Sequence, residues 1–500
     1  MANPSLQIGD SNWAIKEDNL LGYSTAGTRF VPQPITMTRA SLGSRVNPSG
    51  LVEDVELLGS ENIDLTTGST IDASSWGSVT TSGATYLAGG NNPSYHDTGF
   101  VVTSGLTYKL SFTISDYTGT ATMGFSTTGG VSSNARLEGN GSYTEYFTAS
   151  SSVELRIFGL ISNAGVFSNI SVKEYTASNL ARVDYTDGTS SLLVEPQRTN
   201  LVTNSSDFSG WSKLGSTEVT PDTTISPDGT LNADSFTFTT STSDKIQQTV
   251  TVVASQQYTV SCYIKSDSNI TIKMGGAAAS TPINVTTEWV RHTVTQTNGA
   301  GTTAYPQLTS NGTAGTVYVY GFQLEQGSYP TSYIPTSGST VTRNQETYTK
   351  TGISDKINSE EGVLFVEIAG LVDADTYDRV ISLSDNSTTN RVEMKLSSGG
   401  SIKGRFDSAS SDITLAETGL TASNFNKIAL VWSSGKCALF INGVKEQEDL
   451  TFNTFASDVL FDLSFDSAYL GGSSNFYGKV KQLQVYKTAL SDPELVTLTT

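Results

Sequence analysis

The sequence predicts an all-β protein built from tandem antiparallel β-sandwiches. Segments of alternating apolar and polar residues recur at spacings of about 8–12 residues, bounded by clusters of Gly, Asn, Asp and Ser. Residues 108–114, 258–264 and 316–320 are examples. Helical patterns are nearly absent, and the best candidate is 489–496, where Ser491 is placed to cap a short helical turn.

An internal repeat divides much of the chain into two similar parts, residues 58–177 and residues 201–336. Each part has an early tryptophan, a strongly alternating strand in its middle and a tyrosine-containing strand at its close. The matching pieces are Trp76 and Trp211, then 106–112 and 257–263, then 166–175 and 317–325. This order of parts predicts two jelly-roll sandwiches.

The rest of the chain divides into four further segments. Residues 1–57 have too few apolar pieces for a core of their own, and residues 178–200 form a connector. Residues 337–352 are polar and rich in chain breakers, which predicts a linker. Residues 353–500 are a third β domain, whose strongest strand pair lies at 427–441.

Composition excludes several classes of function. The net charge of −19, from 29 basic and 48 acidic residues, argues against nucleic acid or an anionic membrane as a partner. No run approaches the roughly 18 apolar residues of a membrane helix, and the first residues lack the pattern of a signal peptide. Cys262 and Cys437 lie in apolar runs and are expected to be buried free thiols. Two histidines, His96 and His292, leave little material for a histidine metal site or a catalytic triad.

Three segments resemble bacteriophage virion proteins, especially tail fibres and other appendages. They are residues 37–52 (MTRASLGSRVNPSGLV), 181–185 (ARVDY) and 192–201 (LLVEPQRTNL). In many relatives the first piece runs almost directly into the other two, whereas here the first sandwich is inserted between them. Similarity continues to residue 343 in a block that looks like a carbohydrate-binding-module jelly roll, through 208–211, 226–229, 321–325, 332–336 and 341–343.

Residues 353–500 resemble the concanavalin A-like, laminin-G-like sandwich. The matching pieces are 431–432, 438–443 and 478–491. The fold class expected is therefore two jelly rolls followed by a concanavalin A-like domain. Such sandwiches occur in lectins, enzymes and purely structural modules, so the fold alone does not choose among functions.

The resemblance implies a non-enzymatic virion structural protein, a tail fibre or similar appendage that adheres to host-surface polysaccharide. Residues 1–57 are then expected to dock on other virion proteins, and the chain to form a homo-oligomer, with a trimer favoured. Its place is the surface of the phage particle, after synthesis in the bacterial host cytoplasm. One alternative is a head fibre or capsid decoration protein with an architectural role. Another is a polysaccharide depolymerase, ranked last because no β-helix repeat is visible.

Aromatic residues are the candidates for glycan binding, because a pyranose ring stacks its apolar face on an aromatic side chain. The alternative for each is packing: the two tryptophans occupy equivalent places in the repeats, and the face shared by the tyrosines of residues 318 and 320 is expected to be the sandwich core. The candidates are Trp76, Trp211, Tyr318, Tyr320, Tyr329 and Tyr333.

Acidic loops of the last domain offer hard oxygen ligands of the kind that Ca²⁺ takes. Concanavalin A-like relatives often hold Ca²⁺ near such loops, so Ca²⁺ is the one cofactor considered. Solvated turns explain the same residues equally well. The candidates are Asp373, Asp375, Asp378 and Asp385.

Glu195 and Arg198, in the Glu-Pro-Gln-Arg-Thr-Asn string, concentrate charge in a chain of low charge content. A catalytic role would need a second carboxylate at a defined separation. We interpret the two as structural groups that bridge the connector to a neighbouring domain, since an arginine fork satisfies a carboxylate or several carbonyls.

Overall fold

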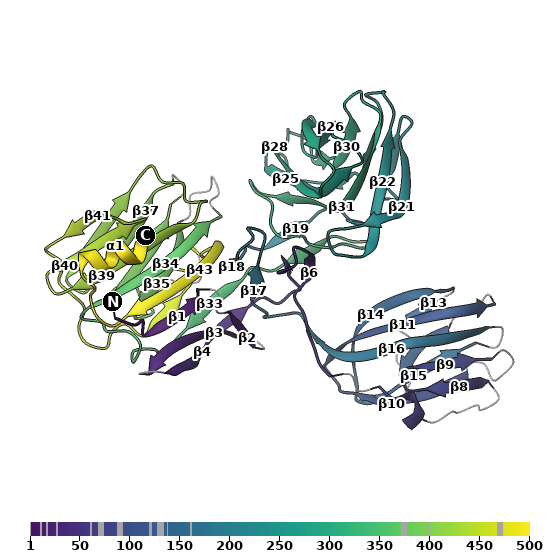
Figure 1. Ribbon diagram of the computed structural model, residues 1–500, viewed down its shortest axis with the longest axis horizontal. Coiled ribbons are helices and arrows are strands. Elements are labelled where there is room, and N and C mark those ends of the chain that lie inside the picture. The colour runs from purple at the N-terminus through teal and green to yellow at the C-terminus, as the bar shows by residue number, and fades with distance from the viewer. Residues whose placement is uncertain are drawn as a thin grey trace. The chain divides into compact units, whose positions relative to one another are not determined.

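The structure is a computed structural model that describes residues 2–10, 13–16, 19–26, 29–60, 63–68, 75–87, 94–119, 123–127, 135–137, 139–160, 163–371, 378–397, 400–467 and 474–500. The chain forms two compact units, Met1–Val55 with Ser178–Thr500 (unit 1) and Glu56–Ala177 (unit 2) (Figure 1). Almost all the regular structure is strand, which confirms the all-β prediction. No helix in the described part of the chain is long and apolar enough to cross a membrane.

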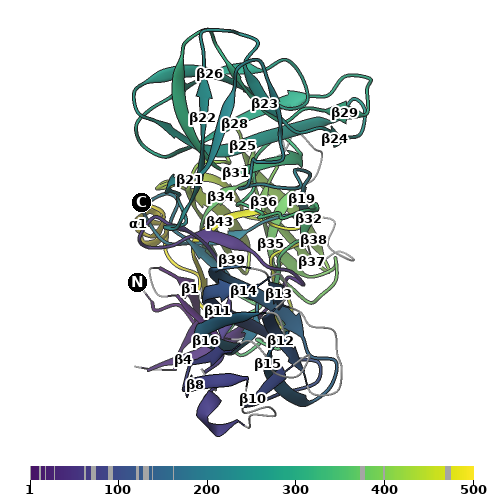
Figure 2. The same cartoon turned by 90° about the vertical axis from the view of Figure 1, so that its right-hand side faces the viewer.

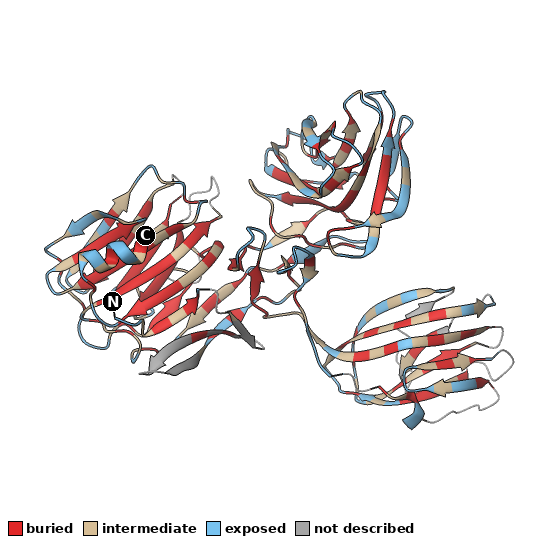
Figure 3. Ribbon diagram, in the orientation of Figure 1, coloured by how far each residue is buried: buried red, intermediate tan, exposed pale blue. Residues whose placement is uncertain are grey.

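Unit 2 is a sandwich of two antiparallel sheets, and its limits differ by two residues from those expected for the first repeat. One sheet has the order β14-β11-β16-β9-β8, with β7 paired to β16, and the other has the order β10-β15-β12-β13. Alternate residues of the long strands point inward, so the buried positions form stripes across the ribbon (Figure 3). The strands are β7 (Leu57–Leu58), β8 (Trp76–Thr80), β9 (Gly83–Tyr86), β10 (Ser94–Val102), β11 (Thr107–Thr118), β12 (Met123–Thr127), β13 (Ala135–Leu137), β14 (Gly141–Thr148), β15 (Val153–Gly159) and β16 (Ala164–Thr176).

The second repeat is a jelly-roll sandwich within unit 1. Its five-stranded sheets have the orders β21-β22-β31-β25-β28 and β20-β23-β30-β26-β27, and Figure 2 shows β22 and β25 with β26 and β23. Aromatic rings around Phe208 fill the space between the sheets. The strands are β20 (Ser212–Leu214), β21 (Glu218–Ile225), β22 (Leu231–Phe238), β23 (Lys245–Gln247), β25 (Gln257–Ser266), β26 (Ile270–Gly275), β27 (Thr281–Val285), β28 (Val290–Thr297), β30 (Gln307–Ser310) and β31 (Gly315–Gln326).

The remainder of unit 1 is a larger sandwich formed by both ends of the chain. One set of pairings runs β41-β40-β39-β34-β43, where β43 also pairs with β1 and β18. The other runs β38-β37-β36-β35-β42-β33-β4-β3. The strands are β1 (Leu6–Gly9), β3 (Asn19–Ala26), β4 (Arg29–Thr38), β18 (Ser191–Val194), β33 (Thr347–Lys350), β34 (Gly362–Gly370), β35 (Arg379–Ser384), β36 (Arg391–Leu396), β37 (Ile402–Ser408), β38 (Ser411–Glu417), β39 (Asn426–Ser433), β40 (Lys436–Ile441), β41 (Val444–Asp449), β42 (Asp462–Ser464) and β43 (Gly478–Tyr486).

The helix predicted near the C-terminus is α1 (Asp492–Thr499). Glu494 accepts hydrogen bonds from the backbone N–H of Ser491 at 3.0 Å and from its hydroxyl at 2.7 Å, which fixes the first turn. The buried Leu495 belongs to an apolar cluster with β34, β39 and β40, so the helix covers one face of that sheet.

Two boundaries expected from the sequence are corrected by the structure. Residues 1–57 are not a separate segment, because β1 pairs with β43, β4 pairs with β33, and the hairpin of β5 (Ser44–Val46) and β6 (Val52–Asp54) also lies in unit 1. Residues 337–352 are not a free linker, since they include β32 (Val341–Arg343) and β33, and Tyr348 is a core residue. Two of its polar residues, Arg343 and Glu346, are buried charges with partners.

Candidate functional site

Five buried charged side chains meet where the jelly roll joins the larger sandwich of unit 1, and we call them the charge cluster. They come from the chain between β4 and β5, from β17 (Arg182–Asp184), from the residue after β18, from β32 and from the residue before β33. No residue among the five is more than 3% exposed as a whole. The members are Arg39, Arg182, Glu195, Arg343 and Glu346.

Glu346 is the centre of the charge cluster. Its carboxylate accepts from Arg182 Nε at 2.7 Å and Nη2 at 2.5 Å, and from Arg39 Nη1 at 2.5 Å. The backbone N–H of Glu195 also donates to it, at 2.9 Å. Burial opposes the charged form, but the two arginines outweigh it and hold the pKa of Glu346 below its usual value.

Glu195 connects the charge cluster to the jelly roll. Its carboxylate lies 3.0 Å from Arg343 Nη1 and 2.8 Å from Arg182 Nη2, and it accepts from the N–H and hydroxyl of Ser332 at 2.8 and 2.7 Å. Burial alone would raise its pKa, yet these partners lower the pKa to about 2. Arg198 lies elsewhere: its guanidinium carbon is 5.3 Å from the ring centre of Tyr329. Both residues of the connector therefore contact the jelly roll, as the sequence interpretation expected, but at different places.

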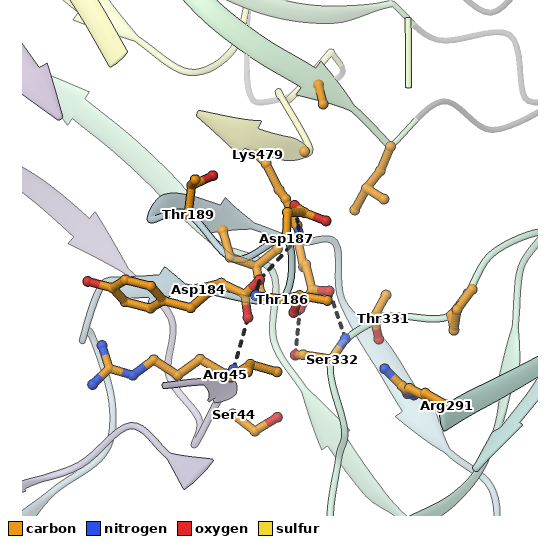
Figure 4. Close-up of a pocket in the computed structure, with 18 of the residues that line it drawn as sticks. Ser44, Arg45, Asp184, Thr186, Asp187, Thr189, Arg291, Thr331, Ser332 and Lys479 are labelled. Carbon is orange, nitrogen blue, oxygen red and sulfur yellow. Dashed lines mark hydrogen bonds and ion pairs between the residues drawn. The ribbon is translucent and has the colours of Figure 1, made fainter. Parts of the chain in front are cut away.

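A cleft of about 1060 Å³ opens beside the charge cluster (Figure 4). The turn at residues 185–190, between β17 and β18, forms one wall, and the β5–β6 hairpin forms another. The jelly roll contributes Tyr263 and Arg291, and the larger sandwich contributes Phe425 and Lys479. Both sandwiches of unit 1 thus line one hollow.

The turn at residues 185–190 presents polar groups to the cleft in fixed positions. Lys479 Nζ lies 3.2 Å from Asp184 Oδ2 and 2.5 Å from Asp187 Oδ2, so one ammonium bridges two carboxylates (Figure 4). Asp184 also accepts from the backbone N–H of Val46 at 2.9 Å, which ties the turn to the β5–β6 hairpin. The side chain of Asp187 is 46% exposed, and Thr186 beside it is exposed as well.

Cations cover aromatic rings along the same cleft. Lys481 Nζ lies 4.2 Å from the ring centre of Phe425, and the guanidinium carbon of Arg291 lies 5.6 Å from that of Tyr263. Burial raises the pKa of the Tyr263 hydroxyl, which Arg291 partly offsets. The cleft therefore combines hydroxyls, carboxylates, cations and ring edges.

The two tryptophans predicted as glycan platforms are core residues, so that prediction is wrong. Trp76 is 6% exposed and packs on Tyr86, with ring centres 5.0 Å apart. Trp211 is 4% exposed and packs on Phe208 and Phe322, at 5.1 and 5.0 Å. An indole enclosed in this way has no face on which a sugar can stack.

The tyrosines of β31 do not face the core, which corrects the preferred interpretation of that strand. Val317 and Val319 point into the sandwich, and Tyr318 and Tyr320 lie on the opposite face. Gly321, with φ of +65°, shifts the register by one residue so that Phe322 points inward.

That outer face is covered only in part. Tyr320 is buried with Tyr333 beneath Val52 of the β5–β6 hairpin, and Tyr333 borders the cleft with only 4% of its surface exposed. Tyr318 is half-buried and donates to Asp267 at 3.0 Å. Tyr329 lines a second hollow of about 610 Å³, under the guanidinium of Arg198.

The two calcium candidates that the structure describes, Asp378 and Asp385, do not form one site. Asp373 and Asp375 lie outside the described residues. Asp378 and Asp385 flank β35 at its opposite ends, about 23 Å apart at roughly 3.3 Å per residue, so they cannot ligate one ion. Asp385 closes its own turn by accepting from the hydroxyl of Ser387 at 2.6 Å. The described residues contain no group of three or more His, Cys, Asp or Glu placed to hold a metal ion.

The cleft residues were not identified as site residues from the sequence, although a partial signal existed. Asp184 and Lys479 both lie in segments that carry a family resemblance, Ala-Arg-Val-Asp-Tyr and Gly-Lys-Val-Lys-Gln. Arg291 lies outside those segments. Nothing in the pattern indicates that these three side chains meet in one hollow, because they lie on strands far apart in the sequence.

Comparison with known proteins supports the assignment of the last domain. Residues 371–496 match the family model of the concanavalin A-like lectin/glucanases superfamily. The C-terminal part of the chain is therefore a concanavalin A-like domain, as the sequence predicted. No curated protein matches the chain.

Several solved structures are similar to parts of the chain. One is the CBM40 of the Ruminococcus gnavus IT-sialidase bound to α2,3 sialyllactose, at 19% identity and a TM-score of 0.26, covering 28% of this chain and 83% of that one. Another is domain 4 of a GH43 extracellular arabinanase from Geobacillus stearothermophilus in complex with arabinotriose. It has 12% sequence identity and a TM-score of 0.26, and the match covers 31% of this chain and 73% of that one. A third is the heptameric SAP-like pentraxin of Limulus polyphemus. It has 16% sequence identity and a TM-score of 0.24, and the match covers 29% of this chain and 71% of that one.

Proposed function

We propose that the protein is a phage virion appendage that binds host-surface glycans, with the cleft of unit 1 as the binding site. The observation that carries the proposal is the convergence on this cleft of the segments that resemble phage appendage proteins. Residues 37–52 supply the hairpin wall, residues 181–185 lead into the turn, and residues 192–201 supply Glu195 beside it.

The chemistry of the cleft suits a saccharide. Sugar hydroxyls both donate and accept hydrogen bonds, so they pair with carboxylates, hydroxyls and ammonium groups held in place. Asp187 and Lys479 form such a pair, with Thr186 alongside. Phe425 adds an apolar edge. Single sites of this kind bind weakly, and we propose that a homotrimer on the particle surface raises the avidity.

A binding assay tests the proposal. The full chain is titrated with polysaccharides extracted from candidate host strains, and Asp187→Ala and Lys479→Ala are compared with Lys436→Ala. Lys436 forms an equivalent surface pair with Glu448 at 2.8 Å, outside the cleft. We expect saturable binding that weakens about 10-fold in both cleft variants, a loss of about 1.4 kcal/mol each, and not in the control.

Two results would overturn the proposal. The first is the absence of saturable binding by a chain that circular dichroism and thermal unfolding show to be folded. The second is binding by Asp187→Ala and Lys479→Ala that equals binding by the wild type. Either result would require a different site or a different role.

A purely architectural role, as a head fibre or capsid decoration protein, is the second candidate. Burial of Trp76, Trp211, Tyr320 and Tyr333 favours it, because four of the six aromatic residues expected to contact sugar serve packing instead. If this role is correct, the cleft variants should be incorporated into particles as well as the wild type, and those particles should adsorb to the host normally.

We propose that the protein acts without catalysis. Glycoside hydrolysis by two carboxylates needs space between them for a sugar and a water molecule. In the cleft, Lys479 Nζ lies between Asp184 and Asp187 and pairs with both. Incubation with a bound polysaccharide should release no new reducing ends, and their release would contradict this part of the proposal.

A further inference from the structure

Arg291 stands apart from the other cations of the cleft. Arg45 pairs with Glu53 at 2.7 Å, Lys479 with Asp187 at 2.5 Å, and Lys481 with Glu367 at 3.8 Å. Among the residues that the structure describes, no carboxylate lies within 4.0 Å of the Arg291 guanidinium. Acidic residues outnumber basic ones by 48 to 29 in this chain, so an arginine without a carboxylate partner needs an explanation.

The jelly roll holds Arg291 in place without neutralising it. The residue is in β28 and pairs with Tyr263 of β25, whose ring lies beneath the guanidinium. Nη2 donates to the hydroxyl of Ser261 at 3.0 Å, and Nε is buried without a hydrogen-bond partner within the described part of the chain. In Figure 4 the nitrogen-bearing end of Arg291 points toward Thr331 and Ser332.

The charges that line the cleft define the ligand further. Four cationic side chains, Arg45, Arg291, Lys479 and Lys481, face three anionic ones, Asp184, Asp187 and Glu195. Each of the other six has an opposite charge within 4.0 Å, and Lys479 serves two carboxylates, so Arg291 is the one cation of this lining without a carboxylate partner among the described residues. A ligand with one negative charge complements Arg291. A dianionic phosphate would bring a second negative charge into a cleft lined by three carboxylates, which would repel it.

We propose that the cleft binds a carboxylate-bearing saccharide, whose carboxylate pairs with the terminal nitrogens of Arg291. The proposal rests on glycan binding in the cleft and names the class of glycan. A guanidinium presents two parallel N–H groups that match the two oxygens of a carboxylate, and this geometry distinguishes a uronic acid from a neutral hexose. The sugar hydroxyls then meet Asp187 and Lys479 across the cleft.

The test compares each polysaccharide with its own carboxyl-reduced form. A panel of neutral and uronic-acid-containing bacterial polysaccharides is titrated against the full chain before and after carbodiimide–borohydride reduction of the carboxylates. We expect binding to native acidic members that falls at least about 10-fold after reduction. Arg291→Gln should lose the same factor, and Arg291→Lys should be intermediate because it keeps the charge but not the fork.

Lys273→Gln is the matched control, since Lys273 lies in β26 of the other sheet of the same sandwich and its loss removes one positive charge. Equal binding of native and carboxyl-reduced forms, binding to neutral members alone, or full binding by Arg291→Gln would refute the acidic-ligand inference and leave glycan binding intact. A folded chain that binds no member of the panel would overturn the proposed function itself. Thermal unfolding establishes that each variant is folded.

Discussion

Replacing Glu195 with Gln tests whether the charge cluster holds unit 1 together. The side chain is 4% exposed and its partners lower its pKa from 4.5 to about 2. That difference corresponds to about 3 kcal/mol of stability at neutral pH, at about 1.4 kcal/mol per pH unit. A second argument gives a similar magnitude. In the variant Arg343 would keep its buried charge without a carboxylate partner, and breaking a buried ion pair in this way lowers the unfolding free energy by about 3–5 kcal/mol. We expect the unfolding free energy of unit 1 to fall by about 3 kcal/mol.

Urea unfolding followed by tryptophan fluorescence measures this loss. In a Trp76→Phe background every remaining tryptophan belongs to unit 1, so the signal reports that unit alone. Glu448→Gln is the control, because its carboxylate pairs with Lys436 at the surface and its removal should cost less than about 1 kcal/mol.

The pH dependence of the unfolding free energy tests the same interaction, because the direction of the change is predicted. The folded-state pKa of Glu195 is depressed, so its contribution is complete above the unfolded value of about 4.5 and is lost as the pH falls toward 2. The difference between wild type and Glu195→Gln should therefore shrink as the pH is lowered from 7 to 3. A variant as stable as the Glu448→Gln control at pH 7, or a deficit that does not change with pH, would refute the reasoning.

Three further predictions concern packing. Trp211→Ala should cost about 3–5 kcal/mol of unfolding free energy, because the ring fills the jelly-roll core; a loss below 1 kcal/mol would contradict this. Burial raises the pKa of Cys262 and raises that of Cys437 to about 12, so neither thiol should react with a thiol reagent at pH 8 until urea unfolds the chain. Gly9→Ala should destabilise the pairing of β1 with β43, seen as faster hydrogen exchange there, because φ is +78° and a Cβ would lie 2.2 Å from the carbonyl oxygen of Lys481; unchanged exchange would contradict it.

Local patterns explain why much of the fold was predictable. Strict alternation in 108–114 and 258–264 corresponds to strands whose apolar residues share the face toward the core, because side chains of a strand alternate between the faces of a sheet. In the second strand the other face is buried too, at Thr259 and Ser261. The repeated tryptophans, Trp76 and Trp211, do occupy cores of separate sandwiches, which is the packing alternative that the repeat favoured.

The errors arose where a residue's environment depends on distant chain. Alternation places Tyr318 and Tyr320 on one face but does not say which face is inward, and the bulge at Gly321 reverses the phase within the same strand. The polar run 337–352 predicts a linker, yet Glu346 within it is buried because Arg39 and Arg182 neutralise it. Arg39 lies 307 residues and Arg182 lies 164 residues from Glu346 in sequence, so a local pattern cannot indicate that they are its partners.

The sequence by itself determined the all-β class, the repeat and the concanavalin A-like domain, because each depends on periodicity or on motifs within a short stretch. Only the tertiary structure decided which charges meet. Arg182, Glu195 and Glu346 became a buried cluster, and Asp187, Lys479 and Arg291 came to line one cleft. The physical reason is that burial and electrostatic pairing depend on distances between strands, and those distances follow from the pairing of β1, β18 and β43 across nearly the whole length of the chain.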